Sequence, residues 1–136
     1  MDKDKIVDGQ TISYKDTITY KDKCNEQIEE LRGKLKTKAF ENALLFYKIE
    51  DYLAAIVSFK NAIKDFPDMD NKDEIEFLIV KCSYLYAKYS IDEKKEERLK
   101  LVFSEYAEYT KNNKPSNKWY EEATKYNKKA QEELSK

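Results

Sequence analysis

Residues that make turns are scarce in this chain. Its 136 residues include only two glycines and two prolines. An all-β sandwich or barrel needs a glycine- or proline-rich turn roughly every 8–12 residues, so this composition excludes that fold class. Gly9 and Gly33 lie too far apart to form a glycine-rich phosphate-binding loop. The scarcity of turn formers therefore favours long helices, and we expect an all-α chain.

Histidine is absent. Its absence excludes serine–histidine–aspartate and cysteine–histidine nucleophile systems, histidine zinc sites and any imidazole general base. The 27 acidic residues are spread among 26 basic ones, so we expect the carboxylates to be solvated surface groups rather than catalytic pairs. The formal net charge of −1 gives no long-range field that would attract nucleic acid. We therefore expect no enzyme, no cofactor and no nucleic-acid partner.

Cysteine is also rare. Cys24 and Cys82 are far apart in the sequence, so they form no C-x-x-C metal or redox motif. Cys82 falls on an apolar helical stripe and is predicted to be a small buried hydrophobic residue. A disulfide with Cys24 is the alternative, and it would need facing helices with Cα atoms less than about 7 Å apart. No apolar run approaches the roughly 18 residues of a membrane span, and the first residues lack the apolar segment of a signal peptide.

What the chain does contain is a long series of apolar residues at helical spacing. Residues 1–20 lack this period and are predicted to be a flexible lead-in. A long helix then runs from about residue 20 to about residue 48. Gly33 lies inside it at a cost of about 1 kcal/mol relative to alanine, and the unbroken stripe favours one helix over two. The predicted apolar face comprises Ile28, Leu31, Leu35 and Ala39.

Capping and helix-breaking residues delimit four further helices. Asp51 is the predicted N-cap of the second helix, and Pro67 ends it. Sequences with capping-box spacing begin at Asn71 and Ser90 and predict the starts of the third and fourth helices. The N-N-K-P sequence at 112–115 ends the fourth helix, and residues 116–135 are predicted to form the fifth. Because the connections are short, we expect antiparallel packing of neighbouring helices.

Residues 36–69 fit the tetratricopeptide pattern. That repeat places a small residue and an aromatic residue on its first helix, Ala-x-x-x-Phe on its second, and a proline after it. A longer second unit, residues 70–115, has the same layout without the alanine pair, and residues 116–135 are predicted to be a polar-faced capping helix. Residues 21–136 are thus predicted to be one tetratricopeptide-like domain of stacked hairpins, a right-handed solenoid fragment. Its repeat-packing residues are Ala43, Phe46, Ala55, Phe59, Ala62 and Pro67.

Four segments follow one another in a recognisable order: EELRGKL at 29–35, AFENA at 39–43, YLAAI at 52–56 and KDFPD at 64–68. In this order they resemble the BamD-type (YfiO) lipoprotein family, and its Bacteroidetes-like members in particular. Residues 77–90 and the charged segment 91–98 also look like the family's following repeat. The resemblance covers roughly residues 24–134, which would be the C-terminal half of that family.

The resemblance implies a periplasmic scaffold tethered to the outer membrane. Such a scaffold docks onto the β-barrel insertase and other subunits of the outer-membrane β-barrel assembly machinery. In the family, the C-terminal repeats mainly hold partner subunits, whereas the upstream repeats face incoming substrate. The family's upstream repeats, signal peptide and lipid-bearing cysteine have no counterpart in these residues, so we expect this chain to be a C-terminal portion.

Tyrosine is the most abundant aromatic residue, with 11 copies, and is the first candidate for recognition. It offers a large contact area and a hydroxyl group at a small entropic cost. For any one tyrosine the simpler interpretation is packing between helices with the hydroxyl at the surface. Tyr47 and Tyr84 lie off the main apolar stripes of their helices, so they are better candidates for a groove or an interface. The candidate partner-binding residues are Tyr47, Tyr84, Trp119 and Tyr120.

Two specific binding modes are disfavoured, and one broader alternative stays open. The acidic turn at 65–76 lacks the order and the glycine of a calcium loop. Co-chaperones of this repeat class grip a carboxylate with lysine and asparagine at positions that Phe40 and Leu44 occupy here. The alternative function is a general peptide-binding tetratricopeptide adaptor that is unrelated to envelope assembly.

Overall fold

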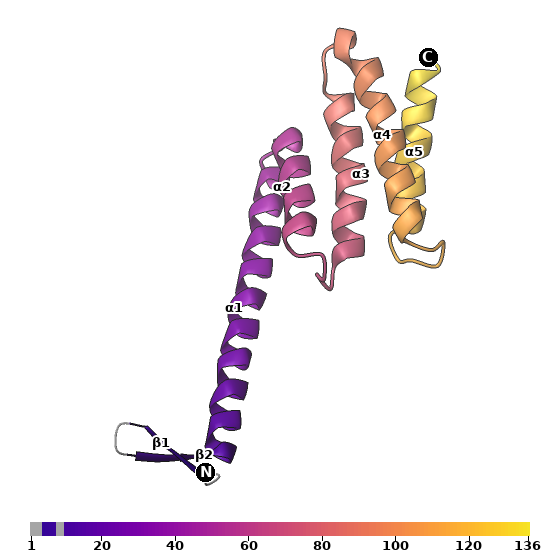
Figure 1. The fold of residues 1–136 in the computed structure, drawn as a ribbon. Helices are drawn as coiled ribbons and strands as arrows, with labels where there is room; N and C mark the ends of the chain where they lie inside the picture. The colour runs from indigo at the N-terminus through magenta and orange to yellow at the C-terminus, as the bar shows by residue number, and fades with distance from the viewer. Residues whose placement is uncertain (1–3, 8–9) are drawn as a thin grey trace. The chain divides into compact units, whose positions relative to one another are not determined.

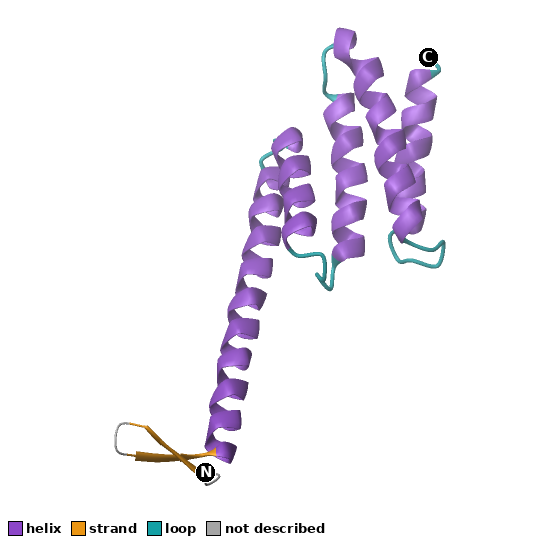
Figure 2. Ribbon diagram, viewed as in Figure 1, coloured by secondary structure: helices purple, strands orange, loops and turns teal. Residues whose placement is uncertain are grey.

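The computed structural model describes residues 4–7 and 10–136, with side chains from Tyr20 onward. The described residues confirm the all-α prediction, since five helices form nearly all of the regular structure (Figures 1 and 2). Contacts divide the chain into two compact units, residues 1–37 and 38–136. The helices are α1 (Tyr14–Lys48), α2 (Tyr52–Asp65), α3 (Lys72–Lys88), α4 (Asp92–Asn112) and α5 (Tyr120–Leu134).

The first unit differs from the predicted flexible lead-in over residues 1–20. Strands β1 (Asp4–Val7) and β2 (Gln10–Ser13) pair antiparallel, and α1 begins at Tyr14. Residues 1–3 and 8–9 of the predicted lead-in lie outside the described residues. The helix continues through Gly33, as predicted, and a Cβ added there would meet open space.

The apolar face that was predicted for this part of α1 is exposed rather than buried. Ile28 is 62% exposed, Leu31 60% and Leu35 48%. The spacing of these residues predicted the helix correctly, but spacing alone does not tell whether another element covers the face. The same face is half-buried or buried farther along α1, at Ala39 and Ala43 in the second unit.

The hairpin of α1 and α2 begins the second unit, and its boundaries agree with the sequence. Asp51 is the N-cap of α2, because its side-chain Oδ1 accepts a hydrogen bond from the Ala54 backbone N–H at 3.2 Å. Glu50 takes the left-handed conformation, φ 64°, that turns the chain between the helices. The helix ends at Asp65, with Phe66 as its C-cap and Pro67 just beyond.

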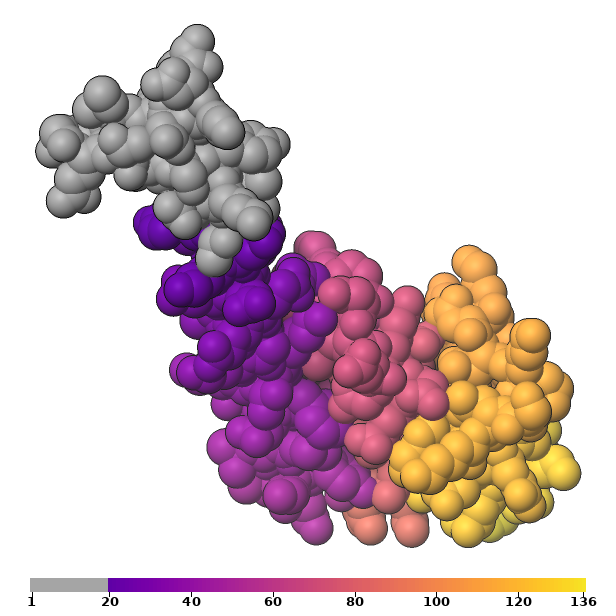
Figure 3. All heavy atoms as spheres, turned by 90° about the horizontal axis from the view of Figure 1, so that it is seen from below, coloured from indigo at the N-terminus to yellow at the C-terminus, as the bar shows by residue number. Residues whose placement is uncertain are grey.

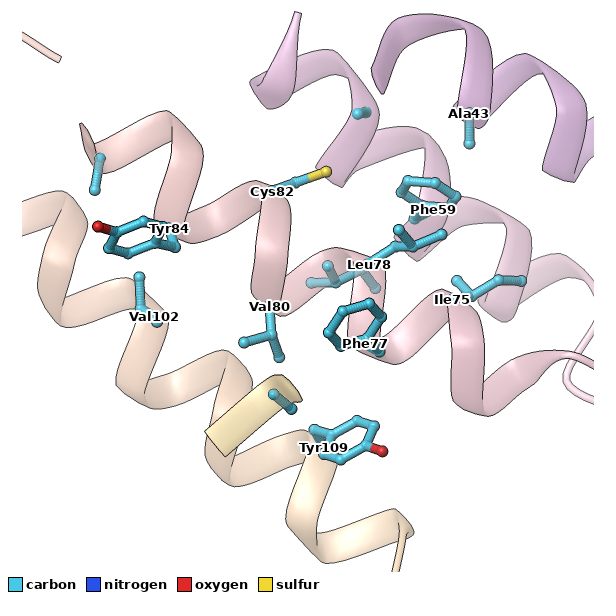
Figure 4. Close-up of a cluster of buried hydrophobic side chains, with 14 of the residues drawn as sticks. Ala43, Phe59, Ile75, Phe77, Leu78, Val80, Cys82, Tyr84, Val102 and Tyr109 are labelled. Atoms are coloured by element: carbon cyan, nitrogen blue, oxygen red, sulfur yellow. The ribbon is translucent and has the colours of Figure 1, made fainter. Parts of the chain in front are cut away.

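Small and aromatic residues fill the core of this hairpin. Ala43, Ala55 and Phe59 are all 0% exposed, and Figure 4 shows Ala43 and Phe59 in the same cluster of buried side chains. The rings of Phe40 and Phe59 lie 6.2 Å apart between their centroids. Of the other predicted repeat-packing residues, Ala62 is buried, Phe46 is half-buried, and Pro67 is exposed beyond the end of α2.

Helix α3 is the centre of the second unit. It contacts α2, α4 and α5, and α4 also contacts α5. Figure 3 shows the side chains of these helices packed against one another, from magenta through red to orange and yellow. In Figure 4 one face of α3, with Ile75, Leu78 and Cys82, lies toward the α1–α2 hairpin. The other face, with Val80 and Tyr84, lies toward α4 and α5, so most of the circumference of α3 is buried.

Both predicted capping boxes are wrong, although the helices begin close to the predicted positions. Asn71 is the N-cap of α3, but its side chain makes no capping hydrogen bond within the described chain. Asp73 Oδ1 instead accepts from the Glu74 backbone N–H at 2.8 Å. At α4 the N-cap is Ile91 rather than Ser90. The Ser90 hydroxyl donates a hydrogen bond to the Tyr86 carbonyl oxygen and accepts one from Arg98. It therefore does not cap the backbone of α4.

The fifth helix begins at Tyr120, later than the predicted residue 116. The reason is Asn117, whose side chain organises the loop that precedes the helix. Its Oδ1 accepts hydrogen bonds from the Trp119 backbone N–H and the Tyr109 hydroxyl, and its Nδ2 donates to Asp73 Oδ2 at 3.1 Å. Asparagine favours such local turns over helix. The loop is therefore tied to both α3 and α4 before α5 starts.

Candidate functional site

A band of aromatic side chains with one lysine in it runs across three helices of the second unit. We call it the aromatic strip: Tyr47 on α1, Phe77 and Lys81 on α3, Trp119 at the N-cap of α5, and Tyr126 on α5. Phe77 is 3% exposed, whereas the other four are half-buried. Each of these four side chains therefore combines a packed part with a part that faces solvent.

Lys81 joins the tyrosines of the two flanking helices. Its Nζ lies 5.2 Å from the centroid of the Tyr47 ring, within the range of a cation–π interaction. The same ammonium group interacts electrostatically with Tyr126 on α5. Lys81 thus fixes the position of one charge between α1 and α5.

The electrostatics of the strip keep this charge in place. Burial by itself would lower the pKa of Lys81, but its interactions with Tyr47, Tyr126 and Glu122 outweigh burial and raise it. Burial raises the pKa of Tyr126, while Lys81 opposes that shift. At neutral pH the strip therefore presents an ammonium group beside the protonated phenol of Tyr126. Such a set of donors suits carboxylates and backbone carbonyls of a bound peptide.

The other end of the strip is held by ring packing. Phe77 and Trp119 stack with their centroids 5.1 Å apart and their planes at 14°, and Tyr126 lies 6.2 Å from Phe77. Lys118 Nζ lies 4.9 Å from the Trp119 ring. Because these rings are fixed by buried neighbours, a partner would meet an ordered surface and lose little side-chain entropy on binding. Two of the predicted partner-binding residues, Tyr47 and Trp119, belong to this strip.

Tyr84, predicted as a groove or interface residue, is buried within the second unit. Tyr84 is 5% exposed, its ring packs 5.5 Å from that of Tyr126, and its hydroxyl donates to Glu133 Oε1 at 3.0 Å. Burial and this hydrogen bond raise the pKa of Tyr84 to about 12. The physical reason is that other helices cover α3 on two faces. A residue that lies off the face toward the α1–α2 hairpin is therefore still buried, by the helices on the other face. Tyr84 therefore ties α3 to α5 and offers no surface to a partner.

Tyr120, the fourth predicted residue, lies apart from the strip. Its ring is 6.4 Å from that of Tyr106 and 6.0 Å from that of Tyr109, both on α4. It is half-buried and borders the polar outer surface of α5, next to Glu121 and Lys125. The structure therefore brings Tyr47 and Trp119 to one band of aromatic residues and leaves Tyr84 and Tyr120 outside it.

Lys81 and Tyr126 were not singled out in the sequence as binding residues. One signal for Lys81 does exist, because it is the sole charged residue between Glu76 and Lys88, a largely apolar stretch of the sequence. A lone charge in such a segment needs a partner. The sequence gives no means of telling that the partners are tyrosines on α1 and α5.

A groove of about 490 Å³ lies on another side of the second unit, between α2, α3 and α4. Ile63, Ile79 and Tyr109 contribute its apolar lining. Lys60 pairs with Glu105 from α2 to α4, and the Asn112 amide donates to Glu76 from α4 to α3. Because these polar side chains already bond to one another, the groove is a weaker candidate for binding than the strip.

Other kinds of site find no support in the described part of the chain. No group of three or more histidine, cysteine or acidic side chains there is arranged to hold a metal ion. Both cysteines are free thiols, with Cys24 half-buried and Cys82 buried. None of the helices in the described residues is long and apolar enough to cross a membrane.

Comparison with models of known protein families and with curated proteins finds no match for this chain.

Proposed function

We propose that this chain is a non-enzymatic protein-interaction scaffold that corresponds to the C-terminal repeats of a BamD-like component of the outer-membrane β-barrel assembly machinery. By resemblance, its partners are the β-barrel insertase and other subunits of that machinery. The resemblance also implies a periplasmic location at the outer membrane, reached through a lipid anchor.

The observation that carries the proposal is the aromatic strip on a stack of tightly packed helices. Tyr47, Lys81 and Tyr126 come from three different helices, and each is half-buried and engaged with the next. A receptor surface whose side chains are already ordered loses little conformational entropy when a partner binds. Large, amphipathic aromatic side chains are also enriched where proteins meet. These features suit binding better than catalysis.

Three of the four segments that resemble the family, AFENA, YLAAI and KDFPD, lie in the first hairpin of the second unit or at its end. AFENA and YLAAI contain Ala43 and Ala55, both 0% exposed. Close helix contact through small residues is what the repeat pattern requires of those positions. This agreement supports a repeat scaffold of the BamD type, and the names of its partners rest on the resemblance alone.

A general peptide-binding adaptor is the second candidate. The strip favours it equally, because an ammonium group flanked by phenols suits many extended peptides. The two functions differ in the partner, so the test must compare the insertase with unrelated peptides.

The test is an affinity measurement between the full chain and purified periplasmic domains of the insertase, accompanied by co-purification from the cell envelope. We expect a specific complex, and we expect the double substitution Tyr47→Ala, Lys81→Ala to weaken it at least about tenfold, as for residues at the centre of an interface. Lys125→Ala, on the exposed face of α5, is the matched control and should bind like the wild type.

Two results would decide against this function. Absence of binding to the insertase domains by a folded chain contradicts the BamD-like role. Equal affinity for the insertase domains and for unrelated unfolded peptides favours the general adaptor. Circular dichroism of each variant shows whether a loss of affinity reflects the surface or the fold.

A further inference from the structure

A second site lies at the end of the second unit where the α1–α2 and α3–α4 turns come together. It is a pocket of about 270 Å³. We call it the tyrosine–arginine pocket and define it by Tyr52, Tyr86, Tyr89, Ser90 and Arg98, all of which line it. None of these residues belongs to the aromatic strip.

Arg98 is held in a fixed position in this pocket. Its guanidinium carbon lies 4.2 Å from the centroid of the Tyr86 ring, and its Nη1 donates a hydrogen bond to Ser90 Oγ at 2.7 Å. The Ser90 hydroxyl in turn donates to the Tyr86 carbonyl oxygen, which orients its lone pairs toward Arg98. The arginine is therefore ordered before any partner arrives, so little entropy is lost when the guanidinium binds.

Within the described residues, most of the hydrogen-bonding capacity of Arg98 is unused. A guanidinium has five N–H donors, and Ser90 is the one hydrogen-bond acceptor recorded for Arg98 among the described residues. No carboxylate in the described chain forms an ion pair with it. An ordered, half-buried arginine that forms no ion pair within the described chain is suited to bind a carboxylate from a partner, because two N–H groups of its planar guanidinium can bond to the two carboxylate oxygens.

The acidic side of the pocket limits how much negative charge can enter. Glu50 and Asp51 line the pocket beside Tyr52. Asp51 already accepts the Ala54 N–H as the cap of α2, whereas Glu50 is exposed. Two carboxylates on one wall repel a strongly acidic segment, so the pocket suits a single acidic side chain placed on Arg98.

Apolar surface beside the pocket indicates what accompanies that carboxylate. Tyr52 and Tyr89 lie with their rings at 14° to each other and 6.3 Å between centroids. Leu53 is 49% exposed, Tyr89 69% and the neighbouring Ile91 64%. Tyrosine and arginine are the residue types that dominate binding energy at protein interfaces, especially next to apolar surface.

We propose that the tyrosine–arginine pocket docks a segment of a partner protein that places one glutamate or aspartate on Arg98 and an adjacent apolar side chain against Tyr52 and Tyr89. This proposal rests on the proposed function as a protein scaffold and adds a second contact site to it. The fixed guanidinium supplies specificity for the carboxylate, and the tyrosines and Leu53 supply contact area.

The experiment titrates the full chain, labelled with ¹⁵N, with the peptides acetyl-Ala-Glu-Leu-Ala-amide and acetyl-Ala-Gln-Leu-Ala-amide. We expect the glutamate peptide to shift the Arg98 side-chain Nε–H signal and the Ser90 amide signal. We expect the glutamine peptide to bind at least about tenfold more weakly, because the fork then loses its charged acceptor. Equal shifts with the two peptides would overturn the proposal.

Variants separate recognition from stability. Arg98→Lys keeps the charge but loses the fork, and it should reduce affinity for the glutamate peptide at least about fivefold. The chain's one other arginine is Arg32, so Arg32→Lys is the matched control and should bind like the wild type. Should Arg98→Lys fail to fold, Tyr89→Ala gives the answer, because Tyr89 is 69% exposed and its removal leaves the core intact. Unchanged affinity in folded Arg98→Lys or in Tyr89→Ala contradicts the proposal.

The peptide titration contains no insertase, so its result is independent of the insertase binding test. The peptides can fail to bind while the complex with the insertase forms, and the peptides can bind while that complex does not form. A peptide acetyl-Ala-Lys-Leu-Ala-amide completes the test, because tighter binding of this peptide would show that Glu50 and Asp51 set the specificity of the pocket, contrary to the proposal.

Discussion

Cys82 gives the second unit a sensitivity to alkaline pH. The residue is 0% exposed, and burial raises the pKa of its thiol from 9.0 to about 12, with Lys81 opposing the shift. The folded state thus holds the thiol proton more tightly than the unfolded state. The stability that this provides is complete below pH 9 and is lost as the pH rises through about 12. We expect the free energy of unfolding to fall across this window by up to about 1.4 kcal/mol per pH unit.

Urea unfolding followed by circular dichroism from pH 7 to pH 11 measures this effect. Burial also raises the pKa of Tyr84 and Tyr109 from 10.0 to about 12, so their contribution begins above that of the thiol. The interval from pH 9 to pH 10 therefore reports mainly on Cys82. Cys82→Ala should flatten the dependence there, whereas Cys24→Ala, the control that removes the other thiol, should not. A Cys82→Ala profile as steep as the wild type in that interval would contradict the prediction.

The sequence predicts well whether a single residue is buried where its helix has one apolar face. The burial of Cys82 was predicted in this way and is confirmed. Tyr84 was misplaced because α3 has a second buried face, and a stripe count on one helix does not reveal how many neighbours that helix has. Lys81 was missed as a binding residue for a related reason, since its tyrosine partners come from helices far away in the sequence.

At the level of elements, the α1–α2 hairpin depends on two residues without bulk. Ala43 and Ala55 are fully buried beside Phe59, so Ala55→Leu has to displace neighbouring side chains or separate the helices. Overpacking of this kind costs about 1–3 kcal/mol. We expect a loss of that size in the free energy of urea unfolding. The same substitution at exposed Ala107 on α4 is the matched control and should change stability by less than about 0.5 kcal/mol. Equal stabilities of the two variants would show that the hairpin is loosely packed.

Helix boundaries were predictable where one residue acts directly on the backbone. Asp51 caps α2 through its own carboxylate, and Pro67 follows the end of that helix. The capping boxes failed because a polar side chain has several acceptors and donors within reach. Ser90 bonds to the Tyr86 carbonyl and to Arg98, and these partners lie on α3 and farther along α4. The start of α5 was misjudged in the same way, since Asn117 bonds to two other helices.

On the scale of the second unit, α5 has one buried and one exposed face. Its inner face places Ala123 and Ala130 in the core, both 0% exposed, and Glu133 accepts the Tyr84 hydroxyl. Its outer face is polar and exposed at residues 121, 122, 125, 128, 131 and 132. An end of a helical stack must combine one buried and one solvated face in this manner. The aromatic strip depends on the same helix, because Tyr126 belongs to it and Trp119 to its N-cap.

Removal of residues 116–136 should therefore damage the fold as well as the strip. Truncation after Pro115 uncovers apolar surface on α3 and α4, including Phe77, Val102 and Tyr109, which are almost fully buried in the intact chain. An exposed apolar area of that kind promotes self-association. We expect aggregation in light scattering or a large loss of helical circular dichroism beyond the signal of the deleted helix.

A full-length pair of variants tests whether the lost surface, rather than the lost length, is responsible. Ala130→Glu places a charge against the core and should detach α5, because an unpaired buried charge costs several kcal/mol. Lys128→Glu, two residues earlier on the exposed face, should leave the fold intact. A truncated chain that stays monomeric with the helicity of α1 to α4 unchanged would mean that α3 and α4 suffice by themselves. In that case α5 would serve the strip alone, and Ala130→Glu should weaken partner binding without lowering stability.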